Sequence, residues 1–86
     1  MHTLTFHTDP GHGWLEVPHT LVASLGIASK VSAYSYQGRG NVYLEEDCDA
    51  SLAIEAMKAR GEDFKIIEVN SPHADSFIRD LHSFRA

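Results

Sequence analysis

Long hydrophobic runs are missing from this 86-residue sequence, and their absence limits what the protein can be. The apolar residues come in short runs such as residues 21–23, whereas a membrane-spanning helix needs ~20 consecutive apolar residues. The N-terminal segment MHTLTFHTD has neither the basic region nor the apolar core of a signal peptide. We therefore expect a cytoplasmic protein that does not enter a membrane.

Cysteine and basic residues are also scarce. Cys48 is the only cysteine, so no internal disulfide can form, as is usual for proteins of the reducing cytosol. The chain has 7 Lys and Arg against 12 Asp and Glu, a formal net charge of −5, and the excess of acid lies in residues 44–86. Direct binding to nucleic acid is not expected, because there is no basic stripe to neutralise phosphates. The charge does not exclude a basic protein partner.

The composition that remains is typical of a small globular domain. With 43% hydrophobic and 22% charged residues, the chain resembles neither a disordered nor a fibrous protein. The length allows one domain, residues 1–86, with a small core, because a chain of this size buries roughly 60–65% of its unfolded surface.

Strands and turns are predicted from alternating and turn-forming residues. Asp9-Pro10-Gly11 is typical of a tight turn, and the glycine-containing QGRGN segment, residues 37–41, is typical of a hairpin loop. Apolar and polar residues alternate on either side of these turns, and the FKIIEV segment is short and apolar enough for a central strand. The predicted strands are residues 2–7, 13–17, 30–37, 42–45 and 64–69.

Three helices are predicted. The first covers residues 18–25 and ends at Gly26. The second covers residues 50–59, with Asp47 or Asp49 as its N-cap. Its predicted inward stripe is Ala50, Ala53, Ile54 and Met57. The third begins at Ser71-Pro72 and turns one apolar face inward, formed by Phe77, Ile78 and Leu81.

The predicted fold class is α+β. The elements follow the order β-β-α-β-β-α-β-α, which favours a small, single-layer, mainly antiparallel sheet with helices packed on one face. The edge strands of such a sheet need protection, and pairing in a homodimer is one way to provide it.

The HTDPGHGW stretch raises the question of a metal site at His7, Asp9 and His12. Imidazole and carboxylate groups are ligands of zinc and of harder divalent ions, and a turn brings such residues together. The spacing matches no established metal motif, and the proline and glycines are explained by backbone geometry. We interpret the stretch as a hairpin turn, with a metal-dependent enzyme at these three residues as an alternative.

A second group of candidates is aromatic. Tyr34 and Tyr36 have the spacing of residues on one face of a strand, and Tyr43 lies on the predicted partner strand. With Arg39 in the loop, they have the composition that protein interfaces favour. The same rings suit the stacking of a nucleotide base, with Arg39 on a phosphate, or simply the covering of the second face of the sheet.

The LEEDCD segment is a third candidate, because four of its residues are acidic. Glu45, Glu46 and Asp47 form an acidic edge suited to a basic partner, or to imitating nucleic-acid phosphates. The structural alternative is a solvated helix N-terminus. The surrounding carboxylates should raise the pKa of Cys48 and make it a poor nucleophile. The sequence also lacks GxSxG, HExxH and phosphate-loop motifs, so no catalytic residue and no cofactor is predicted.

Two blocks, HTDPGHGWLEVP and AYSYQGRGNVYLEEDCD, resemble a family of small proteins found widely on bacteriophages, plasmids and other mobile elements. The family has no assigned activity, so the resemblance supplies no binding or catalytic residue. It implies an accessory protein that acts on a host complex.

These observations favour a non-enzymatic, cytosolic interaction module that binds a protein partner. The candidate surface comprises Tyr34, Tyr36, Arg39, Tyr43, Glu45, Glu46 and Asp47. The first alternative is a small-ligand or nucleotide-binding protein that uses the two glycine loops and tyrosine stacking, and the second is the metal-dependent enzyme.

Overall fold

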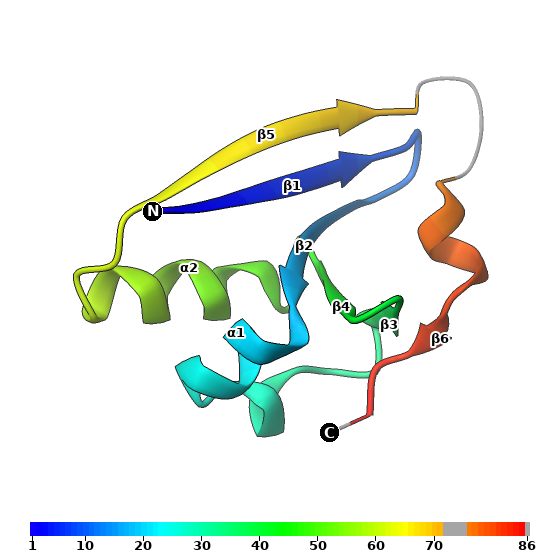
Figure 1. Cartoon of the computed structure of the whole chain (residues 1–86). Coiled ribbons are helices and arrows are strands. Elements are labelled where there is room, and N and C mark those ends of the chain that lie inside the picture. Colours follow the sequence, from blue (N-terminus) through cyan, green and yellow to red (C-terminus); the bar gives the residue numbers. More distant parts are fainter. Residues whose placement is uncertain (72–75, 86) are drawn as a thin grey trace.

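The computed structural model describes residues 1–71 and 76–85 as a small α+β domain with a six-stranded mixed sheet and two α-helices (Figure 1). Two short 3-10 helices, η1 and η2, complete the regular structure. The elements are β1 (His2–Thr8), β2 (Gly13–Pro18), α1 (His19–Leu25), η1 (Ala28–Lys30), β3 (Tyr36–Gly38), β4 (Asn41–Glu45), α2 (Ala50–Ala59), β5 (Phe64–Asn70), η2 (Phe77–Asp80) and β6 (His82–Ser83).

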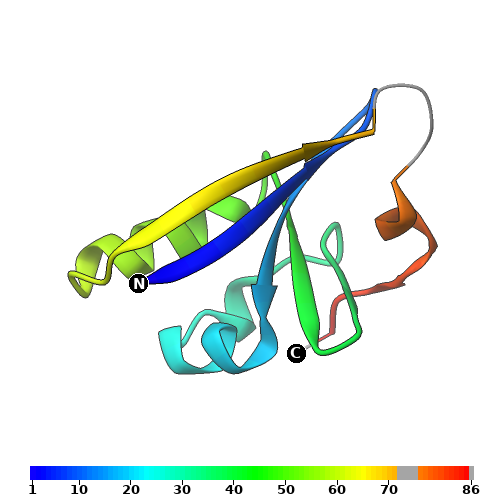
Figure 2. The same cartoon turned by 45° about the horizontal axis from the view of Figure 1, so that its top comes forward.

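The sheet has the strand order β5-β1-β2-β4-β3-β6. β5 pairs with β1 in parallel and the other four pairings are antiparallel, so the sheet is mixed, and its parallel pairing was not predicted. The reason is the connection through α2, because a crossover helix can return the chain in parallel whereas a tight turn cannot. Figures 1 and 2 both show β5 beside β1 with α2 on one side of the pair.

The predicted first hairpin is confirmed by the β1–β2 pairing, in which Thr8 lies opposite Gly13. Asp9 organises its turn with both backbone and side chain. Asp9 N donates to the carbonyl of His12 over 2.9 Å, and Asp9 Oδ1 accepts from the backbone N–H groups of Gly11 and His12 over 3.0 Å each. An aspartate that bonds the backbone two residues on is the usual device of such turns.

The predicted end of the first helix at Gly26 is also confirmed. Gly26 has a φ of 71°, the left-handed conformation that favours glycine, and its N–H donates to the carbonyl of Ala23.

The predicted strand over residues 30–37 is wrong for most of its length, because only Tyr36–Gly38 forms β3. Asp49 causes the difference. Its Oδ2 accepts from Ser32 N (3.0 Å), Ser32 Oγ (2.7 Å) and Ser35 Oγ (2.5 Å), which draws residues 32–35 into a turn. Asp49 occupies the predicted N-cap position of α2, but its side chain forms no capping hydrogen bond with the helix.

The main core lies between one face of the sheet and the two helices. Leu15 and Val17 of β2 and Val42 and Leu44 of β4 point to this side and are buried. The helices contribute Leu21, Val22, Ala50, Ala53 and Met57. Ile54, predicted in the same stripe, is only partly buried.

The second face of the sheet carries a smaller core of Trp14, Tyr43 and Ile78. Ile78 belongs to η2, so the polypeptide covers this face too and the sheet is not covered on one face only. The predicted C-terminal helix is replaced by η2 and the short strand β6, which pairs with β3. Ser76 caps η2, since its Oγ accepts from Ile78 N over 3.3 Å. Pro72, expected at the helix start, lies outside the described residues.

The prediction that FKIIEV is a central strand is wrong, because β5 lies at one end of the sheet. Ile66, Ile67 and Val69 are 40%, 46% and 47% exposed. A short apolar run does not by itself distinguish a central strand from an edge strand, since both have high β-propensity.

Candidate functional site

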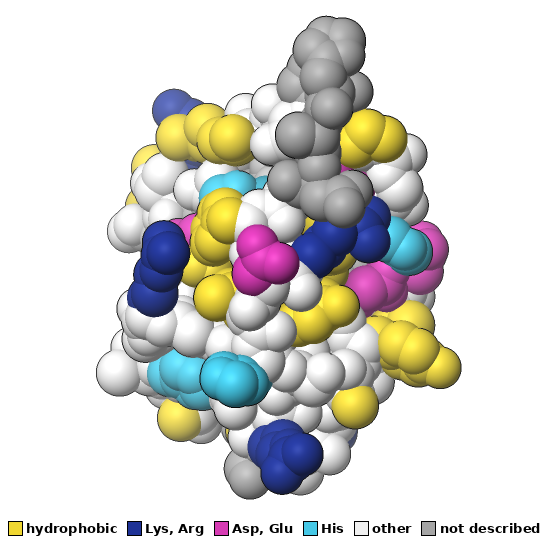
Figure 3. Space-filling view, turned by 90° about the vertical axis from the view of Figure 1, so that its right-hand side faces the viewer, with side chains coloured by type: hydrophobic (Ala, Val, Ile, Leu, Met, Phe, Trp, Pro, Cys, Tyr) yellow, Lys and Arg dark blue, Asp and Glu magenta, His cyan; other side chains and the backbone are white. Residues whose placement is uncertain are grey.

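A pocket of about 220 Å³ lies on the second face of the sheet, next to the loop between β4 and α2. Figure 3 views the molecule from the side of η2, where hydrophobic side chains are interspersed with acidic, basic and histidine side chains. The pocket is lined by His12, Trp14, Tyr34, Tyr36, Glu45, Asp47, Cys48 and Arg79.

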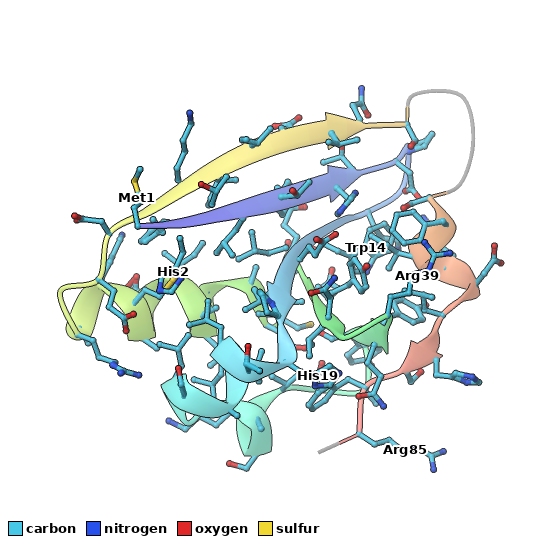
Figure 4. The ribbon with its side chains drawn as sticks, viewed as in Figure 1. Met1, His2, Trp14, His19, Arg39 and Arg85 are labelled. Atoms are coloured by element: carbon cyan, nitrogen blue, oxygen red, sulfur yellow. The ribbon has the colours of Figure 1, made fainter. Side chains whose placement is uncertain are left out.

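Trp14 forms an aromatic wall of the pocket. The alternation of β2 turns it away from the main core, and it lies between the sheet and η2 (Figure 4). Its ring centroid is 6.2 Å from that of Tyr36, with an angle of 65° between the planes, so the two rings form a corner. Trp14 is only 2% exposed, which fixes its ring firmly.

Arg79 reaches the pocket from η2 and is bound by Asp9. Its Nε donates to Asp9 Oδ2 over 2.6 Å and its Nη2 donates to Asp9 Oδ1 over 2.9 Å, while its guanidinium lies 5.3 Å from the Trp14 ring centroid. Ser76 N also donates to Asp9 Oδ2. The Arg79 guanidinium beside Asp9, with these backbone bonds, holds the pKa of the buried Asp9 carboxyl well below its usual range.

The turn accommodates Arg79 because residue 11 is glycine. A Cβ at Gly11 would lie 2.8 Å from Arg79 Nη2, closer than real Cβ contacts come. The Asp9 side chain is fully buried in this pair, so its role is to join the β1–β2 turn to η2.

The acidic side of the pocket is formed by Glu45 and Asp47. Glu45 Oε2 accepts from the backbone N–H groups of Asp47 and Cys48 over 2.9 Å each, and Glu45 Oε1 lies 3.9 Å from His12 Nδ1. Ser35 Oγ accepts from Glu45 N over 2.9 Å, which ties Glu45 to the turn that carries Tyr34. The carboxylate of Glu45 is therefore held in a fixed position at the pocket.

The raised pKa of Cys48 confirms the prediction made from its acidic neighbours. A hydrogen bond with Glu45 is the largest cause, followed by desolvation and by the charges of Glu45, Asp49 and Asp47. The thiol is exposed but stays protonated at neutral pH, which is unfavourable for a nucleophile.

Only part of the predicted aromatic patch lies at the pocket. Tyr34 and Tyr36 both line the pocket, although Tyr34 precedes β3 in a turn and is 72% exposed, so the strand spacing did not place it. Tyr43 lies opposite Tyr36 in the sheet but is buried, and burial raises its pKa. Arg39 does not line the pocket. Its guanidinium lies 5.3 Å from the Phe77 ring centroid, and the Tyr43 ring centroid lies 5.7 Å from the same ring.

Two of the three acidic candidates lie at the pocket. Glu45 and Asp47 line the pocket, whereas Glu46 is exposed and does not. Glu46 therefore serves as a natural control for its two neighbours.

The three residues of the metal alternative have different partners. His7 Nε2 lies 2.9 Å from Glu16 Oε1, Asp9 binds Arg79, and His12 faces Glu45. Within residues 1–71 and 76–85, no group of three His, Cys, Asp or Glu side chains is arranged to hold a metal ion.

The two glycine loops of the nucleotide alternative meet different neighbours. Gly11 abuts Arg79, whereas Gly38 abuts the side chain of Leu81. Within the residues that the structure describes, Gly11, Gly38 and Arg39 do not line the pocket that contains Tyr34 and Tyr36.

Three pocket residues, Trp14, Cys48 and Arg79, were not predicted as site residues, and His12 was a candidate only for the metal alternative. The alternation of side chains along β2 could have identified Trp14. Leu15 and Val17 point to one face of the sheet, so Trp14 points to the other. No local signal identified Arg79, since it lies 70 residues from Asp9 in the chain.

No protein-family model matches this chain, and neither a curated protein nor a solved structure matches it. The resemblance to the mobile-element family thus stays a prediction. In the described residues, neither helix is long and apolar enough to span a bilayer.

Proposed function

We propose that this protein is a non-enzymatic cytosolic interaction module that holds a basic side chain of a partner protein in the pocket. The observation that carries the proposal is the lining itself, in which three aromatic rings and two carboxylates meet in one pocket. Aromatic faces attract cations, and carboxylates supply the opposite charge.

The charge of the pocket supports a cationic rather than an anionic occupant. Arg79 is a cation in the lining, but its guanidinium is paired through two hydrogen bonds with Asp9. Glu45 and Asp47 are then the charges that an occupant meets, and both contribute to the raised pKa of Cys48. A lysine or arginine side chain of the partner supplies the complementary charge.

The size and walls of the pocket support a side chain as the occupant. A pocket of about 220 Å³ is below the ~300–1,000 Å³ of sites for drug-sized ligands. The ring planes of Trp14 and Tyr36 meet at an angle of 65°, and the exposed Tyr34 lies at the rim of the pocket. An anchor residue from a partner, seated in a small pocket of aromatic residues, is a common centre of protein interfaces.

The test uses two reporters that the native chain already carries. Its only tryptophan and its only cysteine both line the pocket, so Trp14 fluorescence and the alkylation rate of Cys48 both report occupancy. Peptides with a central arginine, lysine or trimethyl-lysine are titrated against the same peptide with norleucine or glutamate. The cationic peptides are expected to change the fluorescence and slow alkylation, and the other two are not.

Matched variants locate the binding. Asp47→Asn is expected to weaken binding of the arginine peptide, whereas Glu46→Gln, which removes the same charge outside the pocket, has a smaller effect. Tyr34→Ala is expected to weaken binding about 2- to 5-fold, as fits ~0.5–1 kcal/mol for an exposed cation–π contact. Equal binding of the norleucine peptide, or equal effects of the two acidic variants, would contradict the proposal.

The wider role follows from the resemblance noted in the sequence. A mobile-element accessory protein acts on a complex of its host, and we propose that the basic side chain belongs to such a complex. Co-purification from host lysate, compared between the native protein and a Tyr34→Ala, Asp47→Asn double variant, tests this role. Retention of every partner by the double variant would count against it.

A further inference from the structure

β5 has an open outer edge. It is the terminal strand of the sheet, its neighbour is β1, and within the described residues no strand pairs with its other side. Figures 1 and 2 both show it on the outside of the sheet. A strand edge of this kind carries unpaired backbone donors and acceptors and is a template for another strand.

The register of β5 on β1 shows which backbone groups point outward. At one end of the ladder His2 N donates to the carbonyl of Asp63 over 3.0 Å, and at the other Ser71 N donates to the carbonyl of Thr8 over 2.8 Å. In a parallel ladder, alternate residues of a strand bond to the same neighbour. The residues that direct their backbone groups to the open edge are therefore Phe64, Ile66, Glu68 and Asn70.

The side chains of this strand are unusually apolar for an edge. Ile66 is 40% exposed on one face, and Ile67 and Val69 are 46% and 47% exposed on the other. Lys65 and Glu68 are the charged residues of β5, so the strand is neutral within a chain of net charge −5. Two β5 strands that approach each other therefore repel less than two acidic segments of this chain would.

We infer that β5 pairs with the β5 of a second copy of this chain, antiparallel and about a two-fold axis at Ile67. The four outward-bonding residues are placed symmetrically about Ile67. A two-fold axis there sets Phe64 opposite Asn70 and Ile66 opposite Glu68 of the second copy, and every outward backbone group gains a partner. Ile67 meets its own copy on the axis.

Charge selects this register over its neighbours. With the axis at Ile67, Lys65 lies opposite Val69 and Glu68 opposite Ile66, so no like charges face each other. An axis at Glu68 would set two carboxylates directly opposite, which is destabilising. An axis at Ile66 would set Asn70 beyond the end of the second strand, opposite residue 62, and leave its outward groups without a β5 partner.

The pairing is independent of the proposed function. No residue of β5 lines the pocket, which is built from β2, β3, β4, their loops and η2. A dimer formed through β5 leaves both pockets open, and would present two of them to a partner with repeated basic side chains.

The first test measures the molar mass of the native protein by sedimentation equilibrium over a concentration series. A concentration-dependent dimer is expected, and Ile67→Lys is expected to weaken it at least tenfold. Ser51→Lys adds the same charge at an exposed position of α2 and should leave the dimer intact. A native protein that stays monomeric at every concentration, or equal weakening by both variants, would overturn the inference.

The second test fixes the register by cross-linking, in a Cys48→Ser background. Ile67→Cys places two thiols across the axis at a non-hydrogen-bonded pair, where the Cα–Cα distance of ~4.5 Å is within the range of disulfides. Lys65→Cys is the control, because its two copies would be ~14 Å apart along the strands. With an added thiol oxidant to accept the two electrons, a disulfide-linked dimer is expected from Ile67→Cys alone. A dimer in which position 67 does not cross-link, or position 65 cross-links equally, would overturn the pairing.

Discussion

At the scale of single residues, the Asp9 carboxylate joins two distant parts of the chain. Asp9 Oδ1 accepts from the backbone of the turn that Asp9 itself begins, and both carboxylate oxygens bind Arg79. A carboxylate in a histidine-rich turn suggests a metal ligand in the sequence. In the structure its lone pairs are used by an arginine and three backbone N–H groups, so its role is architectural.

Asp9→Asn is expected to destabilise the protein by about 3 kcal/mol, because it removes the buried negative charge that accepts two hydrogen bonds from Arg79. Urea unfolding, followed by Trp14 fluorescence, measures the change. Asp80→Asn, at an exposed position of η2, is the control and should stay within ~0.5 kcal/mol of the native protein. Similar losses for the two variants would show that the Asp9–Arg79 pair is not a main anchor of η2.

The same carboxylate predicts a pH dependence. Since folding lowers the pKa of Asp9, its contribution is complete above the ordinary aspartate pKa of ~3.9. As the pH falls through that value, the unfolded chain takes up a proton that folded Asp9 does not, and stability declines. Urea midpoints between pH 7 and pH 3 should fall for the native protein and fall less for Asp9→Asn. Parallel curves would contradict the lowered pKa.

At the scale of the elements, Asp49 replaces part of a predicted strand by a turn. Alternation over residues 30–37 is a valid strand signal, but three hydrogen bonds from Ser32 and Ser35 to one buried carboxylate favour the turn. The consequence reaches the pocket, since this turn carries Tyr34 and Ser35 also bonds the backbone of Glu45. A serine-rich segment offers such side-chain hydrogen bonds as an alternative to a strand ladder.

Ser35→Ala is expected to cost about 1–3 kcal/mol of stability, because it removes a buried donor to Asp49 and a buried acceptor for Glu45 N. It should also weaken binding of the arginine peptide, since Tyr34 and Glu45 lose a shared support. Ser51→Ala, at an exposed site, is the control for both measurements. Lower stability with unchanged binding would separate this turn from the pocket.

The elements with local signals were predicted well. The β1–β2 hairpin, the end of α1 at Gly26 and the span of α2 depend on neighbours in the sequence, and the structure confirms them. Three features were not predicted: the short 3-10 helix η2 in place of a longer C-terminal helix, the strand β6, and the edge position of β5. Each of them depends on residues far away in the chain, such as the pairing of β6 with β3.

At the scale of the whole molecule, the charge is uneven, and the acidic half of the sequence supplies the two carboxylates of the pocket. Glu45 and Asp47 belong to residues 44–86, which hold the whole excess of acid in a chain of net charge −5. Acidic surfaces steer basic partners toward them, an effect that acts over a Debye length of about 8–10 Å at physiological salt.

Binding of an arginine peptide is therefore expected to weaken as salt is added, mainly through a slower association rate. Stopped-flow fluorescence of Trp14 between low and high salt measures this rate. The Asp47→Asn variant should show a smaller salt dependence than the native protein. A rate that does not change with salt would leave the acidic side of the pocket without a role in recognition.

The sequence by itself determined the α+β class, the first hairpin and α2, because these follow from composition and from short-range periodicity, and it named Tyr34, Tyr36, Glu45 and Asp47 as candidates. Only the tertiary structure decided that Trp14 and Arg79 join Tyr34, Tyr36, Glu45 and Asp47, and that Tyr43 and Arg39 do not. It also decided that β5 is an edge. The physical reason is that packing and buried ion pairs depend on which distant segments meet, as Asp9 and Arg79 do, and no local pattern encodes that choice.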